Sequence, residues 1–401
     1  MSGPGQDGPE LVLVRYGELA LKGQNRSSFE SRLMDNIRAA VKHVSDVRME
    51  RRQGRIAVRP ARRVEAVARR LQDVFGITSI SPARGVVSQP DAIVPVARRV
   101  LEEAVAALPA GRSVSFRVAT SRADKSFPMT SAEFDRYVAE RILDGFPQLR
   151  VQLKDPELAL GIDIRTERTY VFARRLPGPG GLPVGTLGKV TCLISGGFDS
   201  PVAAWLAMKR GCQVRFVTFH SAPFIGEPAR KKVIDLVRVL ARYQPRCSLH
   251  VVPFAECQLA IKAAGADSYR TVLYRRMMQR IATALAHGSG SSALVTGECL
   301  GQVASQTLEN LTCIGAAAGL PVLRPLIAFD KQETITLSRR IGTHDLSARQ
   351  EPDCCTLFMP ARAVIRGRLE VCREAESQLD LEGLVRRALD GAEELAIESE
   401  V

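Results

Sequence analysis

From residue 189 onward, short apolar segments alternate with stretches that have helical spacing. The apolar segments are VTCLI (190–194), VRFVTF (214–219), LHVVPF (249–254), ALVTG (293–297) and PVLRPL (321–326). Strands that alternate with helices in this way pair in parallel, because each helix returns the chain to the same end of the sheet. The order therefore predicts a doubly wound parallel α/β sheet with helices on both faces.

The first of these strands runs into the hexapeptide SGGFDS, residues 195–200, and a helix is expected over 201–211. Ligands of open α/β sheets bind at this end of the strands. The two glycines let the backbone approach phosphate oxygens, the two serines add hydroxyl donors, and the helix N-terminus favours an anion. No lysine follows the glycines, so the hexapeptide differs from the common γ-phosphate loop. An ordinary glycine-rich turn is the alternative, but the complete pattern favours a phosphate site.

The N-terminal half has a different order of elements. Strands at 11–17 and 55–60 alternate with helical patterns at 26–44 and 63–75, which predicts a small ferredoxin-like α+β fold. A second unit follows, with helices expected at 91–108 and 131–144 and strands at 113–120, 151–154 and 158–173. The Gly/Pro-rich segment 177–188 marks the boundary to the α/β domain.

The chain is basic, and most of the excess lies toward its N-terminus. Residues 1–190 contain 31 Lys and Arg against 21 Asp and Glu, residues 191–380 contain 23 against 16, and residues 381–401 contain 2 against 6. Such a charge suits a polyanionic partner such as nucleic acid, although a solvated, arginine-rich surface explains the counts equally well.

The nine cysteines include no CxxC pair, so the sequence predicts no zinc site. No stretch reaches the roughly 18 apolar residues of a membrane span. The polar N-terminus has no signal-peptide pattern. We therefore expect reduced thiols and a cytoplasmic location.

Several segments together resemble the tRNA 4-thiouridine synthetase family. They are RYGELALKGQNRSSFE (15–30), PGPGGLPVG (177–185), FHSAPF (219–224), YRRMM (274–278), TGECLGQVASQT (296–307) and RPLIAFDKQETI (324–335). The resemblance extends from about residue 11 to residue 366, and it implies ferredoxin-like and THUMP domains before a PP-loop ATP pyrophosphatase domain. The expected parts are a flexible tail (1–9), a ferredoxin-like domain (10–68), a THUMP RNA-binding domain (69–175), a linker (176–188), the PP-loop domain (189–380) and an acidic tail (381–401).

In enzymes that this pattern resembles, the SGGxDS loop holds the β,γ-pyrophosphate of ATP, and Asp199 would bind Mg²⁺ on that pyrophosphate. The resemblance also implies that Lys331 stabilises the leaving pyrophosphate. The implied nucleotide contacts are Leu193, Ile194, Ser195, Gly196, Gly197, Ser200, Thr218, Phe219, Arg275, Gly297 and Gln306. Plain core packing is the alternative for Leu193 and Phe219, and a surface charge is the alternative for Arg275 and Lys331.

The resemblance further implies a reactive cysteine in PDCCTLF (352–358). We favour Cys355 over Cys354, because the motif that follows it matches better. A thiolate there can carry persulfide sulfur, and two structural thiols are the alternative. Some relatives add a C-terminal rhodanese domain, for which residues 381–401 leave no room. Sulfur would then come from a cysteine desulfurase or another persulfide donor.

The expected function is that of an ATP-dependent tRNA sulfurtransferase, which adenylates uridine O4 and replaces it with sulfur to give 4-thiouridine. An additional role in sulfur transfer for thiamine thiazole synthesis is also associated with the family. The alternatives are another PP-loop tRNA-modifying or adenylating enzyme, and a non-catalytic RNA-binding protein with a vestigial nucleotide fold. The oligomeric state stays open, with a homodimer among the options.

Overall fold

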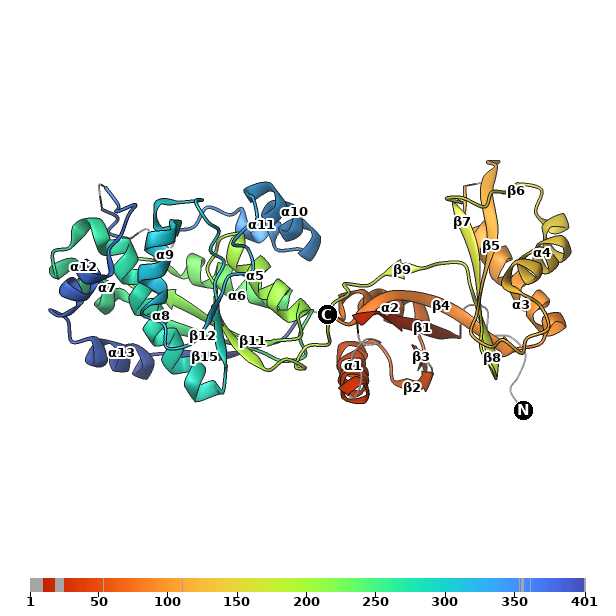
Figure 1. Ribbon diagram of the computed structural model, residues 1–401, viewed down its shortest axis with the longest axis horizontal. Helices are drawn as coiled ribbons and strands as arrows, with labels where there is room; N and C mark the ends of the chain where they lie inside the picture. The colour runs from red at the N-terminus through yellow and green to blue at the C-terminus, as the bar shows by residue number, and fades with distance from the viewer. Residues whose placement is uncertain are drawn as a thin grey trace. The chain divides into compact units, whose positions relative to one another are not determined.

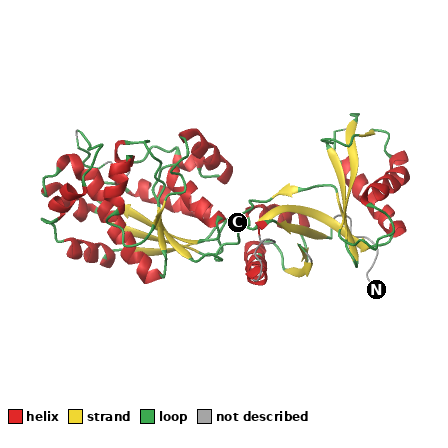
Figure 2. Ribbon diagram, viewed as in Figure 1, coloured by secondary structure: helices red, strands yellow, loops and turns green. Residues whose placement is uncertain are grey.

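The computed structural model describes residues 10–18, 25–52, 54–109, 111–352, 354, 357–360 and 362–399. The expected tail at 1–9 therefore lies outside the described residues. The chain divides into two compact units, Met1–Gly181 and Leu182–Val401, each built on its own β-sheet (Figures 1 and 2). No helix among the described residues is long and apolar enough to cross a membrane.

The first part of the N-terminal unit has the order βαββαβ, which confirms the predicted ferredoxin-like fold, although the sequence predicted only two of its four strands. Its elements are β1 (Leu11–Tyr16), α1 (Arg26–Val41), β2 (Val47–Arg52), β3 (Arg55–Pro60), α2 (Val64–Arg70), the 3-10 turn η3 (Leu71–Asp73) and β4 (Ile77–Val87). They form an antiparallel sheet in the order β2-β3-β1-β4. Strand β2 escaped prediction because its sequence VRMERR is mostly polar and nowhere fully buried.

The second part of this unit carries the expected THUMP elements. They are α3 (Pro90–Ala106), β5 (Val114–Arg122), α4 (Ser131–Ile142), the turn η4 (Leu143–Gly145), β6 (Leu149–Val151), β7 (Leu158–Ile164), β8 (Arg168–Phe172) and β9 (Leu176–Pro177). Helix α4 begins at a capping box, in which Thr130 Oγ1 accepts from the Glu133 amide at 3.3 Å and Glu133 Oε2 accepts from the Thr130 amide at 2.8 Å. The segment expected to be extended over 158–173 is the hairpin of β7 and β8.

Strand β4 belongs to both parts of the unit. Its residues from Ile77 to Ala83 pair with β1, and its residues from Arg84 to Val87 pair with β8. The expected domain boundary between residues 68 and 69 is therefore wrong, because it falls inside α2 and the sheets meet further on, within one strand. The linker expected from residue 176 also begins inside the fold, since β9 pairs with β4.

The C-terminal unit is the predicted doubly wound α/β domain, with helices on both faces of its sheet (Figure 2). The sheet order is β14-β13-β10-β11-β12-β15, and only β15 runs antiparallel to its neighbour. The elements are β10 (Lys189–Leu193), α5 (Asp199–Lys209), β11 (Gln213–His220), α6 (Glu227–Leu240), β12 (Cys247–Pro253), α7 (Ala255–Ala263), η5 (Asp267–Tyr269), α8 (Arg270–Ser289), β13 (Ala293–Val295), η6 (Ala304–Gln306), α9 (Leu308–Gly315), β14 (Val322–Leu323), α10 (Lys331–Ile341), α11 (His344–Ser347), α12 (Leu369–Glu376), α13 (Leu381–Asp390) and β15 (Glu393–Ile397).

The structure corrects the expectation of an acidic tail at 381–401. Helix α13 packs on α8, and β15 extends the sheet by pairing with β12. The acidic side chains are held, since Glu393 forms an ion pair with Arg230 and Glu394 lies 3.6 Å from an Arg215 nitrogen. The composition suggested a solvated segment because five strand residues are too few to show a clear alternation.

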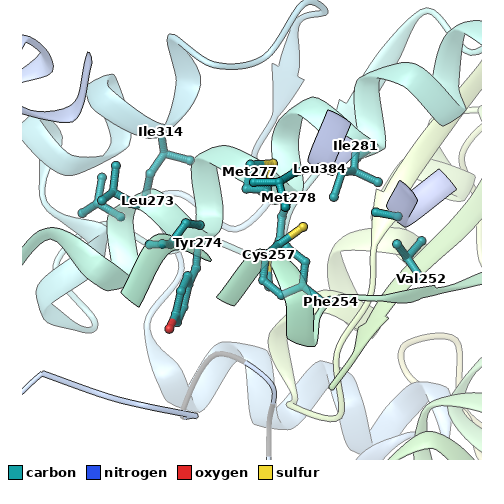
Figure 3. Close-up of a cluster of buried hydrophobic side chains, with 14 of the residues drawn as sticks. Val252, Phe254, Cys257, Leu273, Tyr274, Met277, Met278, Ile281, Ile314 and Leu384 are labelled. Carbon is teal, nitrogen blue, oxygen red and sulfur yellow. The ribbon is translucent and has the colours of Figure 1, made fainter. Parts of the chain in front are cut away.

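The core of this unit gathers around α8. Figure 3 shows Leu273, Tyr274, Met277, Met278 and Ile281 of this helix among side chains from neighbouring elements. Those neighbours include Val252, Phe254, Cys257, Ile314 and Leu384. A rigid, close-packed helix here supports the strand ends that form the site described below.

Candidate functional site

A cavity of about 450 Å³ lies where β10, β11 and β13 end. Parallel strands that end together create such a crevice at the carboxyl edge of the sheet. The structure brings all the implied nucleotide contacts to this cavity. They are Leu193, Ile194, Ser195, Gly196, Gly197, Ser200, Thr218, Phe219, Arg275, Gly297 and Gln306, and Asp199 lines it with them.

The phosphate loop is folded by its own serines. The Ser195 amide donates to Ser200 Oγ at 2.9 Å, and the two hydroxyl oxygens lie 3.2 Å apart. Gly297 follows β13 and approaches the loop so closely that a Cβ there would lie 2.6 Å from the Ser200 nitrogen. Any larger residue at position 297 would therefore push the loop away from the strand ends. The loop shape depends on serine hydroxyls and on a glycine from another strand.

Asp199 and Lys331 meet beside the loop. Lys331 Nζ lies 2.8 Å from Asp199 Oδ1, and Gln302 Nε2 donates to Asp199 Oδ2 at 3.1 Å. Lys331 begins α10, where Asp330 caps the helix, so its position is well defined. Within the described part of the chain, no group of three or more His, Cys, Asp or Glu side chains could hold a metal. One carboxylate fits a Mg²⁺ ion that arrives on substrate phosphates, since Mg²⁺ needs few protein ligands there.

Glu298 is a site residue that the sequence reasoning missed. Its carboxylate is 5% exposed and accepts from Arg275 at 3.1 Å, from Arg324 at 2.7 Å and from Thr296 Oγ1 at 3.0 Å. Arg275 is thus half of an ion pair at the cavity wall, and a free helix-surface charge is the wrong reading for it. The segment TGECLGQ contains Glu298, but one acidic letter there gives no sign that two arginines converge on it.

Lys232 is a second missed residue. It lines the cavity at 6% exposure, and its Nζ donates to the carbonyl oxygens of Ser347 at 3.1 Å and Arg349 at 2.6 Å. Its side chain packs on the phosphate loop, so that a Cβ on Gly196 would meet its Cδ, Cε and Nζ at 3.3–3.4 Å. The spacing of Lys232 with buried Leu236 and Leu240 could have shown that it faces inward.

The cysteines differ in their distance from the cavity and in their burial. Cys355 lies outside the described residues, whereas Cys354 lines the cavity. Burial raises the pKa of four other thiols to about 12, which is typical of inert structural cysteines. These thiols are Cys192, Cys247, Cys257 and Cys372.

A phosphate loop at the edge of a doubly wound sheet, with an acidic residue and a lysine beside it, defines a PP-loop domain. The family models agree with this class. The model described as thiamine biosynthesis protein (ThiI) matches residues 185–381, the ThiI ferredoxin-like domain matches 11–81, and the THUMP domain matches 88–174. The chain belongs to the ThiI family.

Relatives match over almost the full length. The chain is 42% identical over 389 residues to a probable tRNA sulfurtransferase of Thermoanaerobacter sp. (strain X514), which covers 97% of this chain and 99% of that protein. It is 43% identical to a probable tRNA sulfurtransferase of Moorella thermoacetica, with 97% and 98% covered. Among solved structures it is similar to a 4-thiouridine synthetase in complex with RNA and bound ATP, with a TM-score of 0.89, 35% identity and coverage of 97% and 100%.

Proposed function

We propose that the chain is an ATP-dependent tRNA sulfurtransferase that converts a uridine in tRNA to 4-thiouridine. The observation that carries the proposal is one cavity that joins the SGGFDS loop, Asp199 and Cys354. The full-length similarity to a 4-thiouridine synthetase with bound ATP and RNA supports the choice of substrates.

In the first half-reaction, uridine O4 attacks the α-phosphorus of ATP, the bond from that phosphorus to the β,γ-pyrophosphate breaks, and the uridine loses its N3 proton. The loop amides of Gly196 and Gly197 and the ammonium of Lys331 would stabilise the pyrophosphate that leaves. A Mg²⁺ ion on Asp199 would neutralise part of its charge. Lys331 and Asp199 already face each other at 2.8 Å, so both would lie beside the same phosphates.

In the second half-reaction, the terminal sulfur of a persulfide on Cys355 attacks C4 of the adenylated uridine. The C4–O4 bond breaks, and AMP leaves with the oxygen. A second thiol then attacks the Cys355 sulfur and breaks the S–S bond, which yields 4-thiouridine and a disulfide. A cysteine desulfurase or a comparable persulfide donor would recharge the thiol once a dithiol has reduced that disulfide.

RNA binding is assigned to the N-terminal unit. It contains 30 Lys and Arg against 21 Asp and Glu, and it carries the THUMP match. Cationic side chains that neutralise phosphates release counterions, and this supplies affinity with little dependence on base sequence. Folded RNA is recognised mostly through shape, phosphates and 2′-hydroxyls.

The test is nucleoside analysis of tRNA from a strain that lacks the gene. We expect 4-thiouridine to disappear and to return when the intact gene is restored. Restoration with a gene that encodes Asp199→Ala should fail. An unchanged level of 4-thiouridine in the deletion strain would contradict the proposal, and it would favour a different modified nucleoside or a non-catalytic role.

A second role in thiamine thiazole synthesis is favoured by one observation, the match of residues 185–381 to the model described as thiamine biosynthesis protein. The same deletion strain separates the two roles. A thiamine requirement that Cys355→Ser cannot relieve would support sulfur transfer to both products. Growth of the deletion strain without added thiamine would indicate that the chain transfers sulfur to tRNA alone.

A further inference from the structure

Gln258 of α7 is a fully buried amide with a defined orientation. Its Nε2 donates to the carbonyl oxygen of Cys354 at 2.7 Å, and its Oε1 accepts from Ser221 Oγ at 2.5 Å. Ser221 follows directly on β11, whose last residues line the ATP cavity. Because the two ends of the amide have different partners, the side chain cannot turn over without losing both bonds.

Cys354 links the Gln258 amide to the cavity, because it bonds to the amide and also lines the cavity. Cys354 lines the cavity, and its carbonyl oxygen accepts from Gln258 and, at 3.3 Å, from the Leu357 amide. A core side chain therefore fixes the main chain of Cys354 at the rim of the site. Without the Gln258 amide, the Cys354 carbonyl oxygen would keep only one of these two donors, so Gln258 contributes to holding this position.

Contacts from other elements also hold the main chain before and after Cys354. Phe358 has a φ of 56°, a left-handed conformation that residues other than glycine seldom adopt. Its carbonyl oxygen accepts from Arg270 Nη1 at 2.7 Å, and its ring packs on Phe224 with centroids 5.3 Å apart. Such conformations persist where the surroundings impose them. Before Cys354, Lys232 holds the carbonyl oxygens of Ser347 and Arg349.

We infer that Gln258 is a positioning residue for sulfur transfer: it fixes the main chain at Cys354, the residue that precedes the expected sulfur carrier Cys355 in the sequence. The inference rests on the proposed function. Lys232 touches the phosphate loop, whereas Gln258 lies outside the cavity lining and its side chain bonds to Cys354 and Ser221, neither of which belongs to that loop. Loss of the Gln258 amide should therefore affect the second half-reaction and spare the first.

The experiment compares Gln258→Met with the unchanged chain. Pyrophosphate release and 4-thiouridine formation are measured on the same tRNA, with ATP and either sulfide or a desulfurase with cysteine. Reacting atoms must come within about 3–3.5 Å, and a misplacement of about 1 Å costs about 10²-fold in rate. We expect thiolation per pyrophosphate released to fall about 10²-fold with the desulfurase, while pyrophosphate release changes less than about twofold.

Gln244→Met is the matched control. Gln244 is equally buried and donates to the carbonyl oxygens of Val214 and Arg246, but its contacts lie away from the cavity lining. It should leave the ratio of the two half-reactions unchanged. If thiolation by Gln258→Met falls only in step with pyrophosphate release, the inference is overturned, while the proposed function stands.

Gln258→Glu provides a pH readout that a purely structural role would not move. Burial raises the pKa of a carboxyl group, and only the protonated form can donate to the Cys354 carbonyl. The ratio of thiolation to pyrophosphate release should therefore rise as the pH falls for Gln258→Glu, relative to the unchanged chain. A parallel pH profile for the two proteins would overturn the inference even if Gln258→Met fails to fold.

Hydrogen exchange makes the result independent of sulfur chemistry. The Leu357 amide donates to the Cys354 carbonyl, so its exchange reports this position directly. We expect exchange in the peptide around residues 354–358 to be at least about tenfold faster in Gln258→Met and unchanged in Gln244→Met. Equal exchange would refute the positioning role. Absence of 4-thiouridine with the unchanged chain would refute the proposed function instead.

Discussion

In the C-terminal unit, two buried carboxylates each bind two arginines. Arg275 and Arg324 share Glu298, and Arg276 and Arg280 share Glu376 at 2.7–2.8 Å. In the N-terminal unit, Arg15 is 6% exposed, yet it donates to the hydroxyl of Ser81 at 2.9 Å and lies over the ring of Phe172. Its pKa falls to about 10, chiefly through burial and then through Arg55 and Arg175, although Asp163 opposes the shift.

The difference shows two uses of positive charge. In the C-terminal unit, the charge of Arg275 is fixed on Glu298 at the cavity wall, and a charge held in this way favours recognition by geometry. The N-terminal unit keeps a surplus of nine positive charges, against four in the C-terminal unit, and such a field acts on a polyanion at longer range. Substitutions in one unit should then leave the task of the other unit intact.

The largest expected effect comes from Asp199→Ala. Pyrophosphate release should fall by roughly 10²–10³-fold, because the charge that balances the leaving group is disturbed. The dissociation constant for tRNA should stay within about twofold, since Asp199 lies in the C-terminal unit. Turnover assays and filter binding at fixed salt measure the two quantities. Asp345→Ala, which removes an exposed carboxylate from the same unit, should change neither. A loss of tRNA affinity as large as the loss of turnover would break the comparison.

The next largest effect concerns the sulfur-transfer half-reaction alone. Cys355→Ser should still release pyrophosphate but form no 4-thiouridine, because a serine oxygen cannot carry persulfide sulfur. Cys354→Ser should keep at least part of the activity and serves as the control. Both variants are assayed with tRNA, ATP and either sulfide or a desulfurase with cysteine. Normal thiolation by Cys355→Ser with the desulfurase would make this residue structural. Activity with sulfide alone would make it a sulfur carrier that takes no part at the uridine.

A change of stability should follow from Glu376→Gln. Removing this carboxylate leaves Arg276 and Arg280 without their buried partner, which should destabilise the C-terminal unit by roughly 3–5 kcal/mol at neutral pH. Trp205, the one tryptophan of the chain, is buried in this unit and reports its unfolding in urea. The exposed Glu382→Gln is the control.

The pH dependence of that effect has a definite sign. Burial raises the pKa of Glu376, but hydrogen bonds from Arg276 and Arg280 outweigh it and hold the pKa below the ordinary 4.5. A carboxyl group with a lowered folded-state pKa stabilises the fold above its ordinary pKa, and this contribution is lost as the pH falls through the folded value. The difference between the two proteins should therefore shrink below about pH 4.5. A constant difference would contradict the ion-pair explanation.

The smallest effect is expected from a surface lysine of the N-terminal unit. We take Arg51, Arg52, Arg117, Arg122 and Lys125 of this basic unit as candidate RNA contacts. Lys125 is exposed, whereas the four arginines already bind neighbours within the unit. Within the unit, Arg51 donates a hydrogen bond to Ser31, Arg52 to Glu50 and Glu167, Arg117 to the Leu153 carbonyl, and Arg122 to the carbonyls of Phe127 and Met129. Lys125→Ala should reduce the slope of log affinity against log salt by about 0.7–0.9. Lys231→Ala, an exposed lysine of the other unit, should leave the slope unchanged, and equal slopes for both variants would break the comparison.

The sequence by itself determined the fold class and the phosphate loop. The pattern of apolar residues predicted α5 and most strands of the C-terminal sheet within a few residues of their observed bounds. These features are local, because strand, turn and helix N-terminus follow each other within about fifteen residues around SGGFDS. The family resemblance added the residues that the structure gathers at the cavity.

Which polar residues act together could be seen only once the elements had packed. Glu298 meets Arg275 and Arg324 across 23 and 26 positions, and Gln258 meets Cys354 across 96. The tertiary structure also showed that β4 joins the two halves of one continuous sheet and that residues 381–397 belong to the fold. Hydrogen bonds between distant segments leave no period in the sequence, because each partner is one residue whose role exists only after the elements between them have packed.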